Sequence, residues 1–202
     1  MIKISRDSLF TYDKTNYDEF SETLPDYPDV YDYYRFNHVI NLASIDVTGW
    51  NDRINDYLRT AGSSKQLNII VVTTTKPEIW SESLLYKWYG GKKNDVVVIL
   101  GVNETDKTKV SWFKGATFAN GIGNQELLIT LRNDMIGSTV NQGLVDTMIK
   151  DIDQKFTRLS ADQMEYLRDS AVPPTWMLIL TIFLGTIVSV GISYYFHKND
   201  VL

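Results

Sequence analysis

The 202-residue sequence contains no cysteine and only two histidines. Without cysteine, disulfide bonds and thiol catalysis are excluded. The two histidines, His38 and His197, lie far apart in the sequence. The sequence therefore offers little support for a serine-histidine-acid triad. The Gly-x-Ser-x-Gly motif and the phosphate-binding Gly-x-x-x-x-Gly-Lys loop are absent as well. These absences exclude several classes of enzyme.

The chain also lacks a basic surplus and an apolar N-terminal run. Its net charge is -5 and its pI is about 5.0, which argues against nucleic acid as a partner. Residues 1–10 have no apolar core and are followed by acidic residues, so we expect neither a secretory signal nor an organelle transit peptide there. Any membrane insertion is therefore expected to begin from another segment.

Residues 176–196 are that segment, because they form a long apolar run without a charged side chain. A helix needs roughly 20 apolar residues to cross the hydrocarbon core of a bilayer. Trp176 at one end and Tyr194 and Tyr195 at the other are the aromatic residues expected at the two membrane interfaces. The run predicts one C-terminal transmembrane helix, and a buried core helix is the less favoured alternative.

The charges around this run predict an orientation. Lys155, Arg158 and Arg168 precede the run and Lys198 alone follows it, which places the preceding domain on the cytosolic side of a tail-anchored protein. Which membrane it enters is left open. The sequon that begins at Asn103 would be glycosylated only on a lumenal side, and we interpret it as a chance match in a polar turn.

An acidic arm rich in tyrosine, residues 1–37, forms the start of the chain and shows neither a helical nor a strand period. This composition indicates an extended or disordered arm, or else a segment that lies along a protein partner, since tyrosine offers a large contact area at modest entropic cost. The candidate partner-binding residues are Tyr12, Tyr17, Tyr27, Tyr31, Tyr33 and Tyr34.

Helical and strand patterns alternate from residue 38 to residue 158. The expected elements are a short extended segment at 39–43, a helix over 48–62, a strand over 67–74, a helix from Pro77, a strand over 95–102, an antiparallel partner over 109–113, and helices over 125–135 and from about Ser138. A last short helix is expected after the capping signature at 160–163. Together these elements predict an α/β domain with a small mixed sheet flanked by helices.

This order of elements resembles the TPM-domain family, which includes a thylakoid lumen protein, a photosystem II repair protein and a nematode receptor modulator. The segments that carry the resemblance are 39–43, 67–74, 85–100 and 142–149, within about residues 38–157. It implies an αβα sandwich. For some members it implies a metal-assisted acid phosphatase activity, and for others assembly, repair or modulation of a membrane complex without catalysis.

The chain departs from the family pattern at two places. Asp95 stands where members usually carry a glycine, and Gly115 alone remains of a paired-glycine turn. Many members also enter a lumen or periplasm through a cleaved signal, which we do not expect here.

A divalent metal needs converging oxygen ligands, and the candidates are Asp95, Glu104 and Asp106. Asp95 begins its predicted strand, whereas the other two follow the end of the same strand, which separates them by roughly 25 to 30 Å at the rise of a strand. We therefore favour a solvated polar turn and keep the metal site as the alternative.

The predicted organisation is an arm (1–37), a TPM-like domain (38–158), a short helix and proline-containing linker (159–175), the membrane helix (176–196) and a tail (197–202). The function predicted first is a non-enzymatic accessory or structural subunit without a cofactor, which docks the domain onto a larger membrane-associated assembly. That assembly could be an organellar complex or a virion with an internal membrane. The alternatives are a membrane-tethered metal-dependent acid phosphatase and a modulator of a membrane receptor or lipid interface.

Overall fold

The computed structural model describes residues 17–30, 32, 34–88, 95–117, 124–158 and 175–199. It separates into a folded domain and a C-terminal unit that contains the last helix. The predicted short helix after residue 160 lies outside the described residues, as do parts of the arm.

A four-stranded mixed sheet forms the centre of the domain, as predicted. The strands β1 (Val39–Asn41), β2 (Asn68–Thr74) and β3 (Asp95–Val102) are parallel, and β4 (Val110–Thr117) pairs antiparallel to β3. Every residue of β2 and β3 is buried. This burial on both faces explains their continuous apolar runs, which half-solvated strands do not show.

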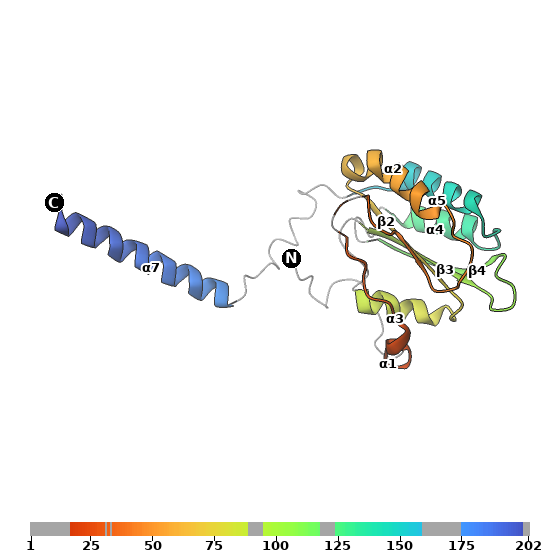
Figure 1. The fold of residues 1–202 in the computed structure, drawn as a ribbon, viewed down its shortest axis with the longest axis horizontal. Helices are drawn as coiled ribbons and strands as arrows, with labels where there is room; N and C mark the ends of the chain where they lie inside the picture. The colour runs from red at the N-terminus through yellow and green to blue at the C-terminus, as the bar shows by residue number, and fades with distance from the viewer. Residues whose placement is uncertain are drawn as a thin grey trace. The chain divides into compact units, whose positions relative to one another are not determined.

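Three helices cover one face of the sheet: α2 (Trp50–Lys65), α4 (Gln125–Met135) and α5 (Gln142–Lys155) (Figure 1). Their apolar stripes recur at helical spacing, for example Ile54 and Leu58 on α2, and pack against alternate strand residues such as Ile69 and Val71. The larger of the two hydrophobic cores lies between these layers.

The opposite face is covered by α3 (Ile79–Trp88) and by residues 20–30, which we call the strap (Figure 1). The strap begins at the end of α1 (Tyr17–Phe20) and includes the 3-10 turn η2 (Ser21–Thr23), and α1 packs beside α3. Leu24 is 6% exposed and joins Trp80, Leu84 and Trp88 in a second core. The domain is therefore an αβα arrangement in which part of the N-terminal arm belongs to one layer.

The two crossover connections leave the sheet by opposite faces. The β1–α2–β2 and β2–α3–β3 connections both move one strand in the same direction across the sheet, yet α2 and α3 lie on different faces. The connections therefore have opposite hands, and one of them is left-handed, which is rare for parallel strands.

The C-terminal unit contains α7 (Thr175–Lys198), a helix of 24 residues. All of its side chains are exposed, including Trp176, Tyr194 and Tyr195. It is long and apolar enough to span a membrane, as the sequence predicted.

Several boundaries differ from the predictions, among them the start of α5 and the end of α2. Helix α5 begins at Gln142 rather than near Ser138, because Asn141 is the N-cap and its side chain accepts from the Leu144 amide. Residues 137–140 instead bond to the start of β4, where the amide of Val110 donates to the Ser138 carbonyl. Helix α2 continues beyond Gly62 to Lys65 and ends at Gln66, whose φ of 50° is left-handed.

Candidate functional site

A polar groove of ≈ 760 Å³ lies on the domain between residues 34–35 and α2. Positions 52, 55, 56 and 59 on α2 share one helical face because they are three or four residues apart. The complete lining is Tyr34, Arg35, Asp52, Asn55, Asp56 and Arg59. Two arginines and two aspartates balance the charge of this lining.

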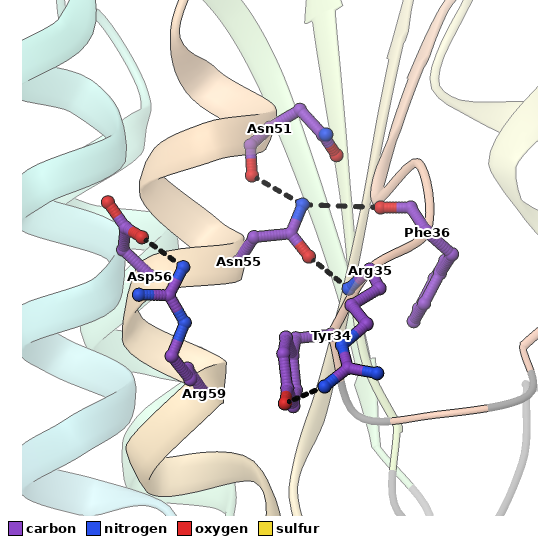
Figure 2. A network of polar contacts seen from close by, with 7 residues as sticks. All are labelled: Tyr34, Arg35, Phe36, Asn51, Asn55, Asp56 and Arg59. Atoms are coloured by element: carbon purple, nitrogen blue, oxygen red, sulfur yellow. Dashed lines mark hydrogen bonds and ion pairs between the residues drawn. The ribbon is translucent and has the colours of Figure 1, made fainter.

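Asn55 clamps the outer wall of the groove (Figure 2). Its side-chain oxygen accepts from the Arg35 amide at 2.5 Å, and its side-chain nitrogen donates to the Phe36 carbonyl at 3.3 Å. The same nitrogen donates to the Asn51 carbonyl at 3.0 Å within α2. One side chain thus ties the backbone of residues 35–36 to the helix.

Arg35 forms the rim of the groove with a backbone φ of 74°, a left-handed conformation that is uncommon outside glycine. The strain costs about 1 kcal/mol or more. Its guanidinium lies 4.6 Å from the centre of the Tyr34 ring and donates to the Tyr34 hydroxyl at 2.6 Å. These contacts and Asn55 hold the strained conformation.

The groove can bind polar groups, but its lining holds no pair suited to nucleophilic catalysis. Arg59 pairs with Asp56 at 2.9 Å, and both side chains are more than half exposed. Such a pair contributes little energy in water.

His38 lies buried next to this wall. Its Nδ1 is 2.8 Å from the Ile69 carbonyl, and since a carbonyl only accepts, Nδ1 carries the proton. Burial lowers the pKa of His38 below its ordinary value, so the ring is neutral at pH 7. Phe36 packs against the ring at a tilt of 41°, with centroids 3.9 Å apart. His38 is thus a buried, neutral ring held through Nδ1 rather than an exposed base.

A second polar cluster surrounds Asp95 at the start of β3. The carboxylate, only 1% exposed, accepts from the Tyr27 hydroxyl at 2.5 Å and from the Asn68 side-chain nitrogen at 2.9 Å. Burial, and then the charge of Asp95, raise the pKa of Tyr27 far above its ordinary value, so the phenol keeps its proton. Asp95 therefore acts as an acceptor that joins the strap to the sheet.

The three candidate metal ligands do not come together. Asp95 is buried at one end of β3, whereas Glu104 and Asp106 are exposed in the turn after its other end. Asp106 accepts from the amide and hydroxyl of Thr108, and these bonds lower the pKa of its carboxyl. Across the described ranges, no three histidine or acidic residues gather to hold a metal.

The candidate tyrosines of the arm separate into different environments. Tyr27 packs edge-on against Trp88, with centroids 5.5 Å apart, and Tyr34 lines the groove. Tyr17 lies in α1. Tyr12, Tyr31 and Tyr33 lie outside the described residues.

The carboxyl ends of β1 and β2 form the crevice at which open α/β sheets often bind ligands. Here the chain's own groups occupy it. The Asn41 side chain bonds to the amide and carbonyl of Ile45 and accepts from the Thr73 hydroxyl at 2.8 Å. Lys107 also donates to the Ala43 carbonyl at 2.7 Å.

Sequence reasoning missed Asn55, Asn68 and the pair formed by Asp134 and Asp151. Asn55 and Asn68 carry no motif, and their roles depend on backbone groups distant in the sequence. Asp151 is 5% exposed on α5. It lies three residues after Met148 and seven after Leu144, so helical spacing alone places this acid on the apolar face.

The fold and α7 together define an α/β-domain protein with one helix that could span a membrane. No family model matches the sequence, and no curated protein matches it. Among solved structures, the chain is similar to the solution NMR structure of the N-terminal domain of cg2496 protein from Corynebacterium glutamicum, at 16% identity and a TM-score of 0.40. The match covers 68% of this chain and 90% of that chain. A similarity of this size leaves the function open.

Proposed function

We propose that this chain is a single-pass membrane-anchored accessory protein that presents a TPM-like domain to a larger assembly. The observation that carries the proposal is α7, whose 24 residues are apolar over nearly their whole length and are all exposed. At the rise of an α-helix they extend over about 36 Å, enough for the roughly 30 Å hydrocarbon core.

The polar side chains inside α7 suit this role. The hydroxyls of Thr181 and Thr186 donate to the carbonyls of Met177 and Ile182, each four residues earlier. Their hydrogen-bonding capacity is thus met within the helix, as a lipid environment requires.

The proposed orientation places the domain in the cytosol. Lys155 and Arg158 precede the helix, and Lys198 is its last residue. With Arg168, basic residues are more frequent on the domain side.

The proposed role is non-enzymatic, because the acidic candidates for metal chemistry are already engaged within the domain or lie apart. Asp95 is engaged by Tyr27 and Asn68. The proposed partners are protein subunits of an organellar complex or of a virion with an internal membrane.

Membrane extraction tests the anchor. The full chain should remain in the membrane pellet after alkaline carbonate extraction. The double variant Leu184→Arg/Val188→Arg places two cations near the helix centre, each costing about 3 kcal/mol, and should be released. The conservative pair Leu184→Val/Val188→Leu is the control. Release of the unchanged chain would contradict the proposal.

A phosphatase assay tests the alternative activity. The assay uses the full chain in detergent with a generic phosphomonoester and Mg²⁺ or Ca²⁺. The unchanged chain and Asp106→Asn should show the same rate of turnover. Turnover lost in that variant would favour the metal-dependent enzyme instead.

Cross-linking in the native membrane tests the docking role. Lysine-directed cross-linking and mass spectrometry should join the domain to other proteins. Truncating residues 1–16 should reduce these cross-links if the arm contributes to docking, while residues 20–30 remain in the second core. A chain that cross-links to no other protein would overturn the accessory role.

A further inference from the structure

The strap is held by hydrogen-bond donors on α3 that contact its carbonyl groups. Lys87 Nζ donates to the Leu24 carbonyl at 2.8 Å, and the indole of Trp88 donates to the Pro25 carbonyl at 3.0 Å. Lys87 also pairs with Asp26 at 2.7 Å. Residues 24–26 are thus bound through two backbone carbonyls and one acidic side chain.

Further contacts set which side chains the surface accepts. The Trp80 indole donates to the Thr23 hydroxyl at 3.1 Å, and Tyr27 donates to the buried Asp95. Leu24 enters the second core. The domain therefore contacts the side chains of Thr23, Leu24, Asp26 and Tyr27. We call Trp80, Lys87, Trp88 and Asp95 the strap-binding surface.

Side chains, rather than a shared sheet or helix, hold the strap. Residues 24–30 belong to no helix or strand, and among the described residues no backbone-to-backbone hydrogen bond joins them to the rest of the domain. The same contacts would form whether the strap comes from its own chain or from another copy. The choice then depends on the effective concentration of each.

We propose that the strap-binding surface also takes residues 20–30 of a second copy of this chain, so that neighbouring copies are joined by strap exchange. The charges are complementary, because the acidic Asp26 meets Lys87. The proposal rests on the membrane anchoring proposed above, since confinement to one bilayer raises the concentration of neighbouring copies.

The absence of native cysteine allows a direct test. Full chains carrying Asp26→Cys alone and Lys87→Cys alone are mixed at equal amounts in phosphatidylcholine vesicles, incubated and treated with a short bismaleimide. The expected result is a cross-linked dimer on a denaturing gel, several-fold above a matched mixture of Asp26→Cys with Arg59→Cys. Arg59 is an exposed residue on the opposite face of the sheet and reports random collisions.

The double variant Asp26→Cys/Lys87→Cys shows that the reagent spans the two positions within one chain. Internal cross-linking of this variant without dimers in the mixture means that the strap stays within its own chain, and overturns the proposal. Equal dimer yield in the Arg59→Cys mixture overturns it as well. Carbonate extraction of the same vesicles reports the anchor separately, so a failed anchor and an absent exchange give different results.

Discussion

At the scale of single residues, Asn55 is the side chain on which the groove wall depends most. Replacing it with alanine removes the acceptor of the Arg35 amide and the donor to the Phe36 carbonyl. We expect Asn55→Ala to lower the free energy of unfolding by about 1–3 kcal/mol. Urea unfolding of the full chain in mild detergent, followed by tryptophan fluorescence, measures this loss.

Arg59→Ala is the matched control, because it removes an exposed ion pair from the same helical face. Its expected effect is within about 0.5 kcal/mol. Equal losses in the two variants would mean that Asn55 does not clamp the wall.

Asp151 is the second residue with a measurable signature. Burial, and then the nearby charge of Asp134 on α4, raise the pKa of Asp151 to about 6. Lys150 and Lys155 on its own helix oppose the rise. Because the folded state keeps the proton more tightly than the unfolded chain, this group makes the domain less stable as pH rises from about 4 to about 6.

Asp151→Asn should remove that loss. At pH 8 the variant is expected to be about 1–3 kcal/mol more stable than the unchanged chain, and at pH 4 the two should be similar. Urea unfolding at a series of pH values gives the comparison. Asp146→Asn, at an exposed position, is the control, and a parallel pH profile for all three chains would contradict the assignment.

At the scale of elements, the antiparallel pair β3–β4 depends on a close approach of Trp112 to Gly101. A Cβ atom at position 101 would overlap the Trp112 indole, which also donates to the Lys76 carbonyl at 3.1 Å. Gly101→Ala is expected to cost about 1–3 kcal/mol by overpacking.

A double-mutant cycle with Trp112→Ala separates this steric cause from a general effect on the strand. On the Trp112→Ala background, Gly101→Ala should cost much less, because the clashing ring is gone. Additive losses measured by urea unfolding would show that the indole is not the cause.

Elements with strong local patterns were predicted with correct boundaries. The strand β3 and the helix α4 begin and end where their apolar patterns predict. The predicted start of α5 was wrong because Thr139 forms a β-bridge with Lys109, which lies 30 residues earlier in the sequence. Periodicity indicates which face of a helix is apolar. It does not reveal that a distant strand pairs with residues that would otherwise begin the helix.

At the scale of the whole molecule, the proposed orientation predicts the state of Asn103. This sequon residue is exposed in the turn after β3, so an oligosaccharyltransferase could reach it if the domain were lumenal. With the domain in the cytosol, Asn103 should stay unmodified, while a glycosylation tag appended after Leu202 should be modified. A shift in gel mobility on glycosidase treatment measures both sites, and the opposite pattern would reverse the orientation.

The sequence by itself determined α7, the mixed α/β class and the buried central strands. Each of these follows from composition or period within one short segment, where the hydrophobic effect and backbone hydrogen bonding act locally. The absence of cysteine likewise needed no structure.

Only the tertiary structure decided what the polar residues do. Tyr27 meets Asp95 across 68 positions, and Arg35 meets Asn55 across 20. The faces taken by the two crossover helices were also decided only in the tertiary structure. They depend on how α2, α4 and α5 cover one face of the sheet while α3 and the strap cover the other. Each of these contacts joins one side chain to a group in a distant segment. A single side chain produces no periodic pattern, so such contacts cannot be recognised from the sequence.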